Sequence, residues 1–159
     1  MSGRVSSMVR PRQRVNKQSI VLSEYETLHA LLRRACPDLD EWPMRWRYEA
    51  ADLAPGAAIV ASFKPFLLDL LRRKVSKTTF RRDLQGLWQV GGEIIRRRHD
   101  DPDLKRLPVD HLVRQVIEED GGPLIWPRVS ETAQNTIDAT CRKLYRFLNQ
   151  STAVERLKP

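Results

Sequence analysis

The sequence contains only two cysteines, Cys36 and Cys141, in 159 residues. They lie far apart and form no CxxC pair, which argues against a zinc site and against a disulfide framework. So few cysteines are typical of a protein that works in a reducing compartment. We therefore expect a cytoplasmic protein.

Long apolar runs are also missing. No run approaches the roughly 20 residues that cross a bilayer, so we expect no membrane association. The N-terminus carries basic residues without a following apolar segment, so it lacks the pattern of a secretory signal. Few apolar runs resemble strands, which predicts a helical core.

Catalytic motifs are absent as well. His29, His99 and His111 are isolated, and none has a partner at i+3 or i+4 that would make a metal-ligand pair. The consecutive acids at 118–120 would point in different directions on a helix, so they suit a helix end better than a metal-dependent nuclease. There is no GxSxG elbow, no Walker motif and no GxGxxG loop. We therefore expect neither an enzyme nor a bound metal or cofactor.

What the sequence does have is an excess of basic residues. Lysine and arginine number 28 against 20 acidic residues, which gives a formal net charge of +8 and a pI near 10.0. Segment 72–98 carries nine basic residues and only two acids, Asp83 and Glu93, so it holds +7 of that charge. A helix that faces nucleic acid would have such a composition, and so would an ordinary solvated helix.

The same segment has the apolar spacing of an α-helix. One face collects Phe80, Leu84, Leu87, Trp88, Ile94 and Ile95. Ser76 is a candidate N-cap whose hydroxyl would accept a hydrogen bond from a backbone N–H near Thr79. Glycines inside a helix often mark the close approach of another backbone. We therefore predict that Trp88 and Gly91-Gly92 are buried at a helix crossing.

Residues 1–56 divide into three parts. Residues 1–19 are basic with little apolar content and predict a disordered arm, which would either track phosphates or only aid solubility. Residues 20–35 predict a helix with a Ser23–Glu26 capping box and an apolar stripe, ended by Pro37. The rest of 20–56 is a tryptophan-rich linker. Its aromatic side chains could stack on bases, but we favour a role in clamping the linker onto the core.

Residues 57–150 predict one helical domain, followed by a frayed tail at 151–159. A helix at 57–74 should have Pro65 in a first turn, because proline in a helix interior costs about 3 kcal/mol. Pro108 should open another helix at N1 after a charged loop at 99–107. The apolar loop 124–127 should tuck into the core. The last helix should start at Ser130 and turn Ala133, Ile137, Cys141, Leu144, Phe147 and Leu148 inward.

Two segments resemble the core-binding domain of tyrosine recombinases, the SAM-like N-terminal domain of phage integrases. One runs from Phe66-Leu67 through Ser76-Lys-Thr-Thr-Phe-Arg-Arg-Asp-Leu84. The other runs from Ser130 to Leu148 and ends in Cys141-Arg-Lys-Leu-Tyr-Arg-Phe-Leu148. The resemblance covers residues 57–150. It implies an all-α, compact bundle of four to five helices that clamps DNA, here with an extra N-terminal helix and basic arm.

The chain departs from the family pattern in several ways. Asp138 stands where the family has an apolar residue, Ala133 stands where it has threonine, and Gly91-Gly92 has no counterpart. The chain ends where the recombinase catalytic domain would begin. Tyr145 corresponds to a packing tyrosine and is not expected to be a nucleophile. The resemblance therefore implies DNA binding without recombinase chemistry.

We predict a non-catalytic protein that binds double-stranded DNA in a mobile element or another DNA transaction. Phosphate contacts are expected near the start of the 72–98 helix from Lys74, Lys77, Thr78, Thr79, Arg81 and Arg82. A second track is expected from Arg142, Lys143 and Arg146. Such contacts predict weak or shape-based specificity unless the basic arm reads a groove. The alternative is a protein-interaction or regulatory subunit of a larger mobile-element or defence complex. Clustered basic residues would favour DNA, and scattered ones the protein partner.

Overall fold

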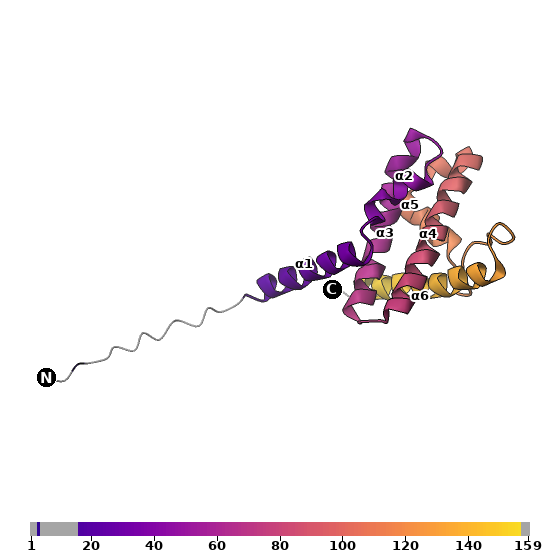
Figure 1. Cartoon of the computed structure of the whole chain (residues 1–159). Helices are drawn as coiled ribbons and strands as arrows, with labels where there is room; N and C mark the ends of the chain where they lie inside the picture. Colours follow the sequence, from indigo (N-terminus) through magenta and orange to yellow (C-terminus); the bar gives the residue numbers. More distant parts are fainter. Residues whose placement is uncertain (1–2, 4–15, 157–159) are drawn as a thin grey trace.

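A computed structural model of the chain describes Gly3 and residues 16–156, with side chains as far as Gln150. This part is all-helical and contains no strand, which confirms the predicted class. Figure 1 shows the α-helices α1 (Lys17–Ala35), α2 (Trp42–Trp46), α3 (Leu53–Arg72), α4 (Lys77–Asp100), α5 (Val109–Val116) and α6 (Glu131–Arg156). Short 3-10 helices lie at Leu39–Glu41, Ala50–Asp52 and Pro102–Arg106. Helices α3 to α6 form the predicted bundle, and α6 extends past the expected boundary at Gln150.

Helices α3 and α4 form the central hairpin. Ile59, Phe63 and Leu67 of α3 are fully buried, as are Leu87 and Ile95 of α4. Burial of each such side chain contributes about 1.5–3 kcal/mol. The Thr79 amide donates to Ser76 Oγ at 3.1 Å, which confirms Ser76 as the N-cap of α4. The apolar spacing that predicted the helix therefore also identifies its buried face.

Helix α3 begins at Leu53 rather than at residue 57, and it differs from the prediction in two further respects. Segment Ala50–Arg72 is long and apolar enough to cross a membrane, although no such segment was expected. The central helix of a globular domain has the same character, and α3 packs against α1, α2, α4 and α5. Pro65 lies in the helix interior, so its placement in a first turn was wrong. Pro65 and Ala61 are both exposed, so water can hydrogen-bond the Ala61 carbonyl that proline leaves without a partner.

Helix α6 crosses α4 at Gly86. A Cβ atom at Gly86 would lie 2.7 Å from Cβ of Thr140, so only glycine permits this approach. The Thr140 hydroxyl donates to the buried carboxylate of Asp83 at 2.9 Å. Ser130 Oγ accepts from the Ala133 amide at 3.0 Å and caps α6 as predicted. Ile137 and Leu144 are buried in the core.

The tryptophan-rich linker clamps onto the core, as favoured from its sequence. Trp42, Trp46 and Trp88 form one cluster with ring centroids 5.5–5.6 Å apart. Trp46 Nε1 donates to the Trp88 carbonyl at 3.1 Å. A Cβ atom at Gly91 would overlap the Trp46 indole. The predicted close approach at Gly91-Gly92 is therefore present, but its partner is a side chain of α2 rather than another backbone. Trp88 is half-buried, not fully buried.

Helix α1 begins earlier than predicted, at Lys17. Asn16 Oδ1 accepts from the Gln18 amide at 3.2 Å, so the cap is Asn16 and the Ser23–Glu26 capping box was wrong. Of its apolar stripe only Leu32 is buried, because the N-terminal half of α1 extends away from the bundle (Figure 1). Residues 1–2 and 4–15 of the predicted arm lie outside the described residues, as do residues 157–159 of the predicted tail.

The segment between α4 and α6 also differs from expectation. Helix α4 continues through His99 to Asp100, and the predicted charged loop contains a 3-10 helix. Pro108 is the N-cap of α5 rather than its first residue. In the apolar loop 124–127 only Ile125 is buried, while Leu124 and Trp126 are exposed. Gln134 Oε1 accepts hydrogen bonds from the backbone N–H groups of Ile125 and Trp126. These bonds fix the loop backbone in a conformation that leaves the Leu124 and Trp126 side chains facing outward.

Candidate nucleic-acid interface

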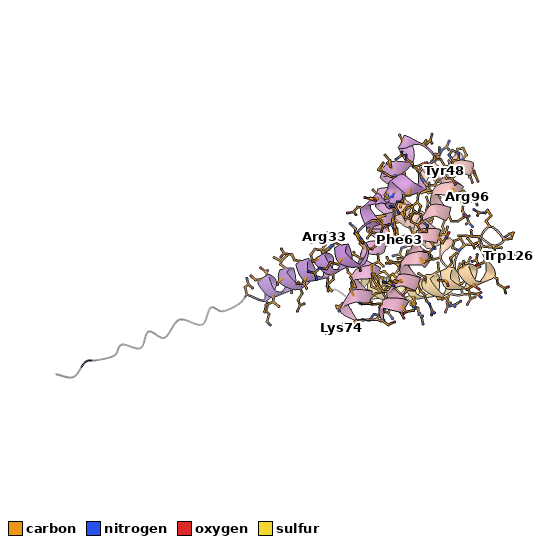
Figure 2. The ribbon with its side chains drawn as sticks, in the orientation of Figure 1. Arg33, Tyr48, Phe63, Lys74, Arg96 and Trp126 are labelled. Atoms are coloured by element: carbon orange, nitrogen blue, oxygen red, sulfur yellow. The ribbon has the colours of Figure 1, made fainter. Side chains whose placement is uncertain are left out.

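The predicted basic residues gather at the end of the molecule where α3 turns into α4. Figure 2 shows Lys74 at this end and Arg96 and Tyr48 at the opposite end. The exposed members of the predicted set are Lys74, Lys77, Thr78, Arg81, Arg82, Arg142 and Arg146. Thr79 and Lys143 are half-buried. The position of these residues follows from the order of the helices, which brings the start of α4 against the middle of α6.

Two neighbouring hollows join the start of α4 to α6, and both are lined by Thr79 and Lys143. The first, of about 480 Å³, continues to Arg146 on α6 and to Arg72 and Arg73 at the end of α3. Asp69 lies between these two arginines, at 2.7 Å from Arg72 and 3.0 Å from Arg73. This hollow is therefore rich in arginine but partly neutralised.

The second hollow, of about 350 Å³, is lined mainly by polar side chains. Arg82 contributes from α4 and Asn135 and Thr136 contribute from α6. Hydroxyl, amide and guanidinium groups are the side-chain donors that proteins present to phosphate oxygens. Asn135 and Thr136 were not predicted as site residues, although their polar character and spacing on one side of α6 could have suggested them.

The α6 track is only partly assembled. Lys143 Nζ lies 3.1 and 3.3 Å from the two carboxylate oxygens of buried Asp83, so much of its charge is already paired. Arg142 points elsewhere and donates to the Asp120 carbonyl at 3.0 Å. Successive residues on a helix are about 100° apart, which is why Arg142 leaves the face that Lys143 and Arg146 share.

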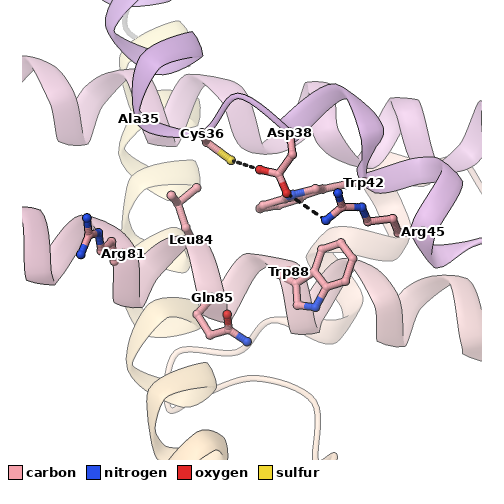
Figure 3. A pocket seen from close by; sticks show the side chains of 9 residues that line it. All are labelled: Ala35, Cys36, Asp38, Trp42, Arg45, Arg81, Leu84, Gln85 and Trp88. Carbon is pink, nitrogen blue, oxygen red and sulfur yellow. Dashed lines mark hydrogen bonds and ion pairs between the residues drawn. The ribbon is translucent and has the colours of Figure 1, made fainter.

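Arg81 faces a different hollow from Arg82. Together with Trp88 it lines a hollow of about 390 Å³ between α4 and the α1–α2 connection (Figure 3). Asp38 on the far wall accepts from Arg45 at 3.1 Å and from the Cys36 thiol at 3.3 Å. Burial, followed by the hydrogen bond to Asp38, raises the pKa of Cys36 to about 12. Burial likewise raises the pKa of Cys141 to about 12, so neither thiol is an ionised nucleophile at neutral pH.

Several cations at this end have no acidic partner. Among the described residues no ion pair engages Lys74, Lys77, Arg81, Arg82 or Arg146. Lys77 and Arg81 are one helical turn apart and project from the same side of α4. They stand beside the N-terminus of α4, where free backbone N–H groups favour a bound anion.

The opposite end of α4 is also basic, but part of its charge is paired with the buried carboxylate of Glu93. The buried carboxylate of Glu93 accepts from Arg96 at 2.7 and 3.0 Å, from Arg97 at 3.0 Å and from Arg128 at 2.8 Å. Burial alone raises the pKa of Glu93, but the three arginines outweigh it and lower the pKa to about 2. The i+3 and i+4 spacing of Arg96 and Arg97 could have indicated this pairing, whereas nothing in the sequence indicates Arg128.

The described residues contain no group of three histidine, cysteine, aspartate or glutamate side chains that could hold a metal ion. Comparison of the chain with protein-family models, with curated proteins and with solved structures finds no match.

Proposed function

We propose that the protein binds double-stranded DNA and performs no chemistry on it. One observation carries this proposal. Lys74, Lys77, Arg81, Arg82 and Arg146 are exposed and unpaired at one end of the molecule, whereas at the other end of α4 Arg96 and Arg97 pair with Glu93 and Arg98 is buried. A cluster of free cations on one end is the electrostatic footprint expected of a nucleic-acid-binding protein.

In this proposal a DNA phosphate lies at the start of α4. Lys77 and Arg81 contact it or its neighbour from one side of the helix, and Lys74 contacts the backbone near the α3–α4 turn. Lys143 and Arg146 line the hollow that would hold a second backbone segment. These contacts supply affinity and orientation.

We also infer a relationship to the SAM-like core-binding domains of tyrosine recombinases. The α3–α4 hairpin, the serine-capped start of α4 and the closing helix α6 support it, because they carry the segments that resemble that family. The protein would then serve a DNA transaction such as that of a mobile element.

A protein partner is the second candidate. The observation that favours it is helix α1, which exposes Ile20, Val21, Leu22 and Tyr25. Exposed apolar residues close together on a helix are characteristic of interaction sites. In this case the basic end would bind an acidic protein surface in a larger complex.

Titration of a fluorescent duplex with the protein at several salt concentrations distinguishes the two candidates. We expect binding at low salt and a linear fall of log affinity with log salt. Lys77→Glu combined with Arg81→Glu should weaken binding strongly and reduce the slope by about one unit per lost phosphate contact. The fold should survive, because both residues are exposed.

The control is Lys105→Glu combined with Arg106→Glu, two exposed positions in the 3-10 helix that follows α4, of which Lys105 gives up only an exposed ion pair with Glu49. It changes the net charge equally, far from the proposed interface, and should alter the slope much less. If wild type fails to bind at low salt, the DNA proposal is wrong. If the two double variants lose affinity equally, the charge matters only as a total.

A further inference from the structure

Neutral and basic polar residues form a regular row along α4, exposed in its N-terminal part and ending in a hollow that Arg45 and Arg128 also line. Thr78, Arg82, Gln85 and Gln89 fall at i, i+4, i+7 and i+11, which is one line along the helix. Thr78, Arg82 and Gln85 are exposed, and Gln89 is half-buried. Among the described residues no hydrogen bond or ion pair occupies the side chains of Arg82, Gln85 or Gln89.

The chemistry of this row differs from that of the phosphate-contacting residues beside it. Glutamine carries no charge, so it gains nothing from the electrostatic attraction of a phosphate. Its amide can instead donate to N7 of adenine and accept from the N6 amino group of the same base. The arginine guanidinium matches O6 and N7 of guanine. The threonine methyl group can contact the methyl group of thymine.

We propose that α4 is a recognition helix whose Arg82, Gln85 and Gln89 side chains read base edges in the DNA major groove. This inference rests on the proposed function and replaces the expectation of purely shape-based specificity. From Thr78 to Gln89 the helix rises about 17 Å, at about 1.5 Å per residue. That length covers about five base pairs, so the recognised site contains guanine and adenine within one such stretch.

The cations beside the row suit this placement. Arg81 lies on the side of α4 that faces the α1–α2 connection, and Lys77 lies one helical turn before it, whereas Lys143 and Arg146 lie on the α6 side. A helix in the major groove has a phosphate backbone on each side, because the groove is only about 12 Å wide. The groove of duplex RNA is too narrow to admit a helix, so the ligand is DNA.

Selection from a library of randomised DNA duplexes tests the inference. Wild-type protein should enrich a motif that contains guanine and adenine. Gln85→Ala combined with Gln89→Ala should lose the preference for adenine, with about 5- to 150-fold weaker binding to the selected site per lost contact. Affinity for random duplex and its salt slope should stay unchanged, since neither substitution alters charge. Gln115→Ala, at an exposed position of α5, is the matched control and should retain the full preference.

Two further variants keep the test decisive. Gln85→Ala alone changes an exposed side chain and should fold even if the double variant does not. Arg82→Lys keeps the charge but loses the bidentate fork, so it should lose the preference for guanine and retain the salt slope. Circular dichroism checks the fold of each variant.

The outcomes separate the two proposals. Wild type that binds duplex DNA without enriching any motif overturns the recognition row and leaves the proposed function standing. A motif that persists in the folded Gln85→Ala variant and in the folded Arg82→Lys variant also overturns it, as does equal affinity for duplex RNA. Absence of duplex binding at low salt removes the proposed function and the recognition row together.

Discussion

Lys74 occupies an unusual backbone conformation at the turn between α3 and α4. Its φ of 55° is left-handed, which costs a residue other than glycine about 1–2 kcal/mol. The turn closes with a hydrogen bond from the Lys74 amide to the Leu71 carbonyl and another from the Val75 amide to the Leu70 carbonyl. This is the Schellman arrangement, in which glycine is the usual residue at the Lys74 position. A lysine there gives up stability and adds a charge at the proposed interface.

Replacing Lys74 by glycine should therefore separate stability from binding. We expect the free energy of unfolding to rise by about 0.5–1 kcal/mol, because the strain is relieved at some cost in chain entropy. Duplex affinity should fall, with a salt slope smaller by about one. Thermal denaturation and anisotropy titration measure the two effects. Lys74→Ala, which removes the charge but keeps the strain, should weaken binding without gaining stability; equal stability of the two variants would contradict this account.

Glu93 makes stability depend on pH. Its pKa is about 4.5 in an unfolded chain and about 2 in the folded protein, so the unfolded state binds more protons between these values. The contribution of Glu93 is therefore complete above about pH 4.5 and is lost as the pH falls toward 2.

Glu93→Gln should lower the free energy of unfolding at neutral pH by about 1–3 kcal/mol. We expect less than the 3–5 kcal/mol of a fully buried pair, because Arg96, Arg97 and Arg128 are partly exposed and can turn to solvent. The variant should also lose stability less steeply than wild type below pH 4.5. Urea denaturation across pH 2.5 to 7 measures both effects. Parallel curves for the two proteins would show that Glu93 does not carry this dependence.

At the scale of the element, α4 owes its position to its glycines. Gly86 admits Thr140 of α6, and Gly91 admits the Trp46 indole of α2 from a different direction. Glycine inside a helix costs up to about 1 kcal/mol relative to alanine. The close packing that Gly86 and Gly91 allow offsets this cost. These two glycines therefore let α6 and α2 approach α4 closely, in addition to its packing on α3 and α5.

Gly91→Leu should destabilise the protein by about 1–3 kcal/mol through overpacking against Trp46. The expected result is a lower melting temperature. Gly92→Ala is the comparison, because its Cβ would lie 3.3 Å from the Trp46 ring, a tight contact that a small shift can relieve. A Gly91→Leu variant with wild-type stability would mean that α2 does not pack against α4 as described.

The helices themselves could be predicted from sequence, because apolar spacing and caps are local. Ser76 and Ser130 are correct caps for this reason. Predictions failed where contacts between residues far apart in the sequence determine the local structure or burial. Pro65 stays inside α3 because long-range packing outweighs a local penalty. The stripe of α1 predicted burial along the helix, but the course of the chain carries its N-terminal half away from the bundle.

At the scale of the whole molecule, the sequence predicts a basic surface but not which of its basic residues are free and which are ion-paired. The net charge of segment 72–98 indicates a polyanion partner, yet only the N-terminal half of α4 presents free cations. Pairing of Arg97 and Arg128 with Glu93, and of Lys143 with Asp83, depends on contacts across the fold. The separation of Arg81 from Arg82 follows from helical geometry, but which neighbour each meets requires the packing of α2 and α6.

The tryptophan cluster also gives the protein a built-in optical signal. The cluster contains three of the protein's four indoles, with ring centroids 5.5–5.6 Å apart, whereas the fourth, Trp126, is exposed on the loop before α6. Indoles this close couple their electronic transitions, so the near-ultraviolet circular dichroism signal comes mainly from the cluster and depends on the docking of α2. The long-wavelength fluorescence emission comes mainly from Trp126. Undocking of the linker and rearrangement of the loop are therefore distinguishable in the unlabelled protein, by two spectra from one sample.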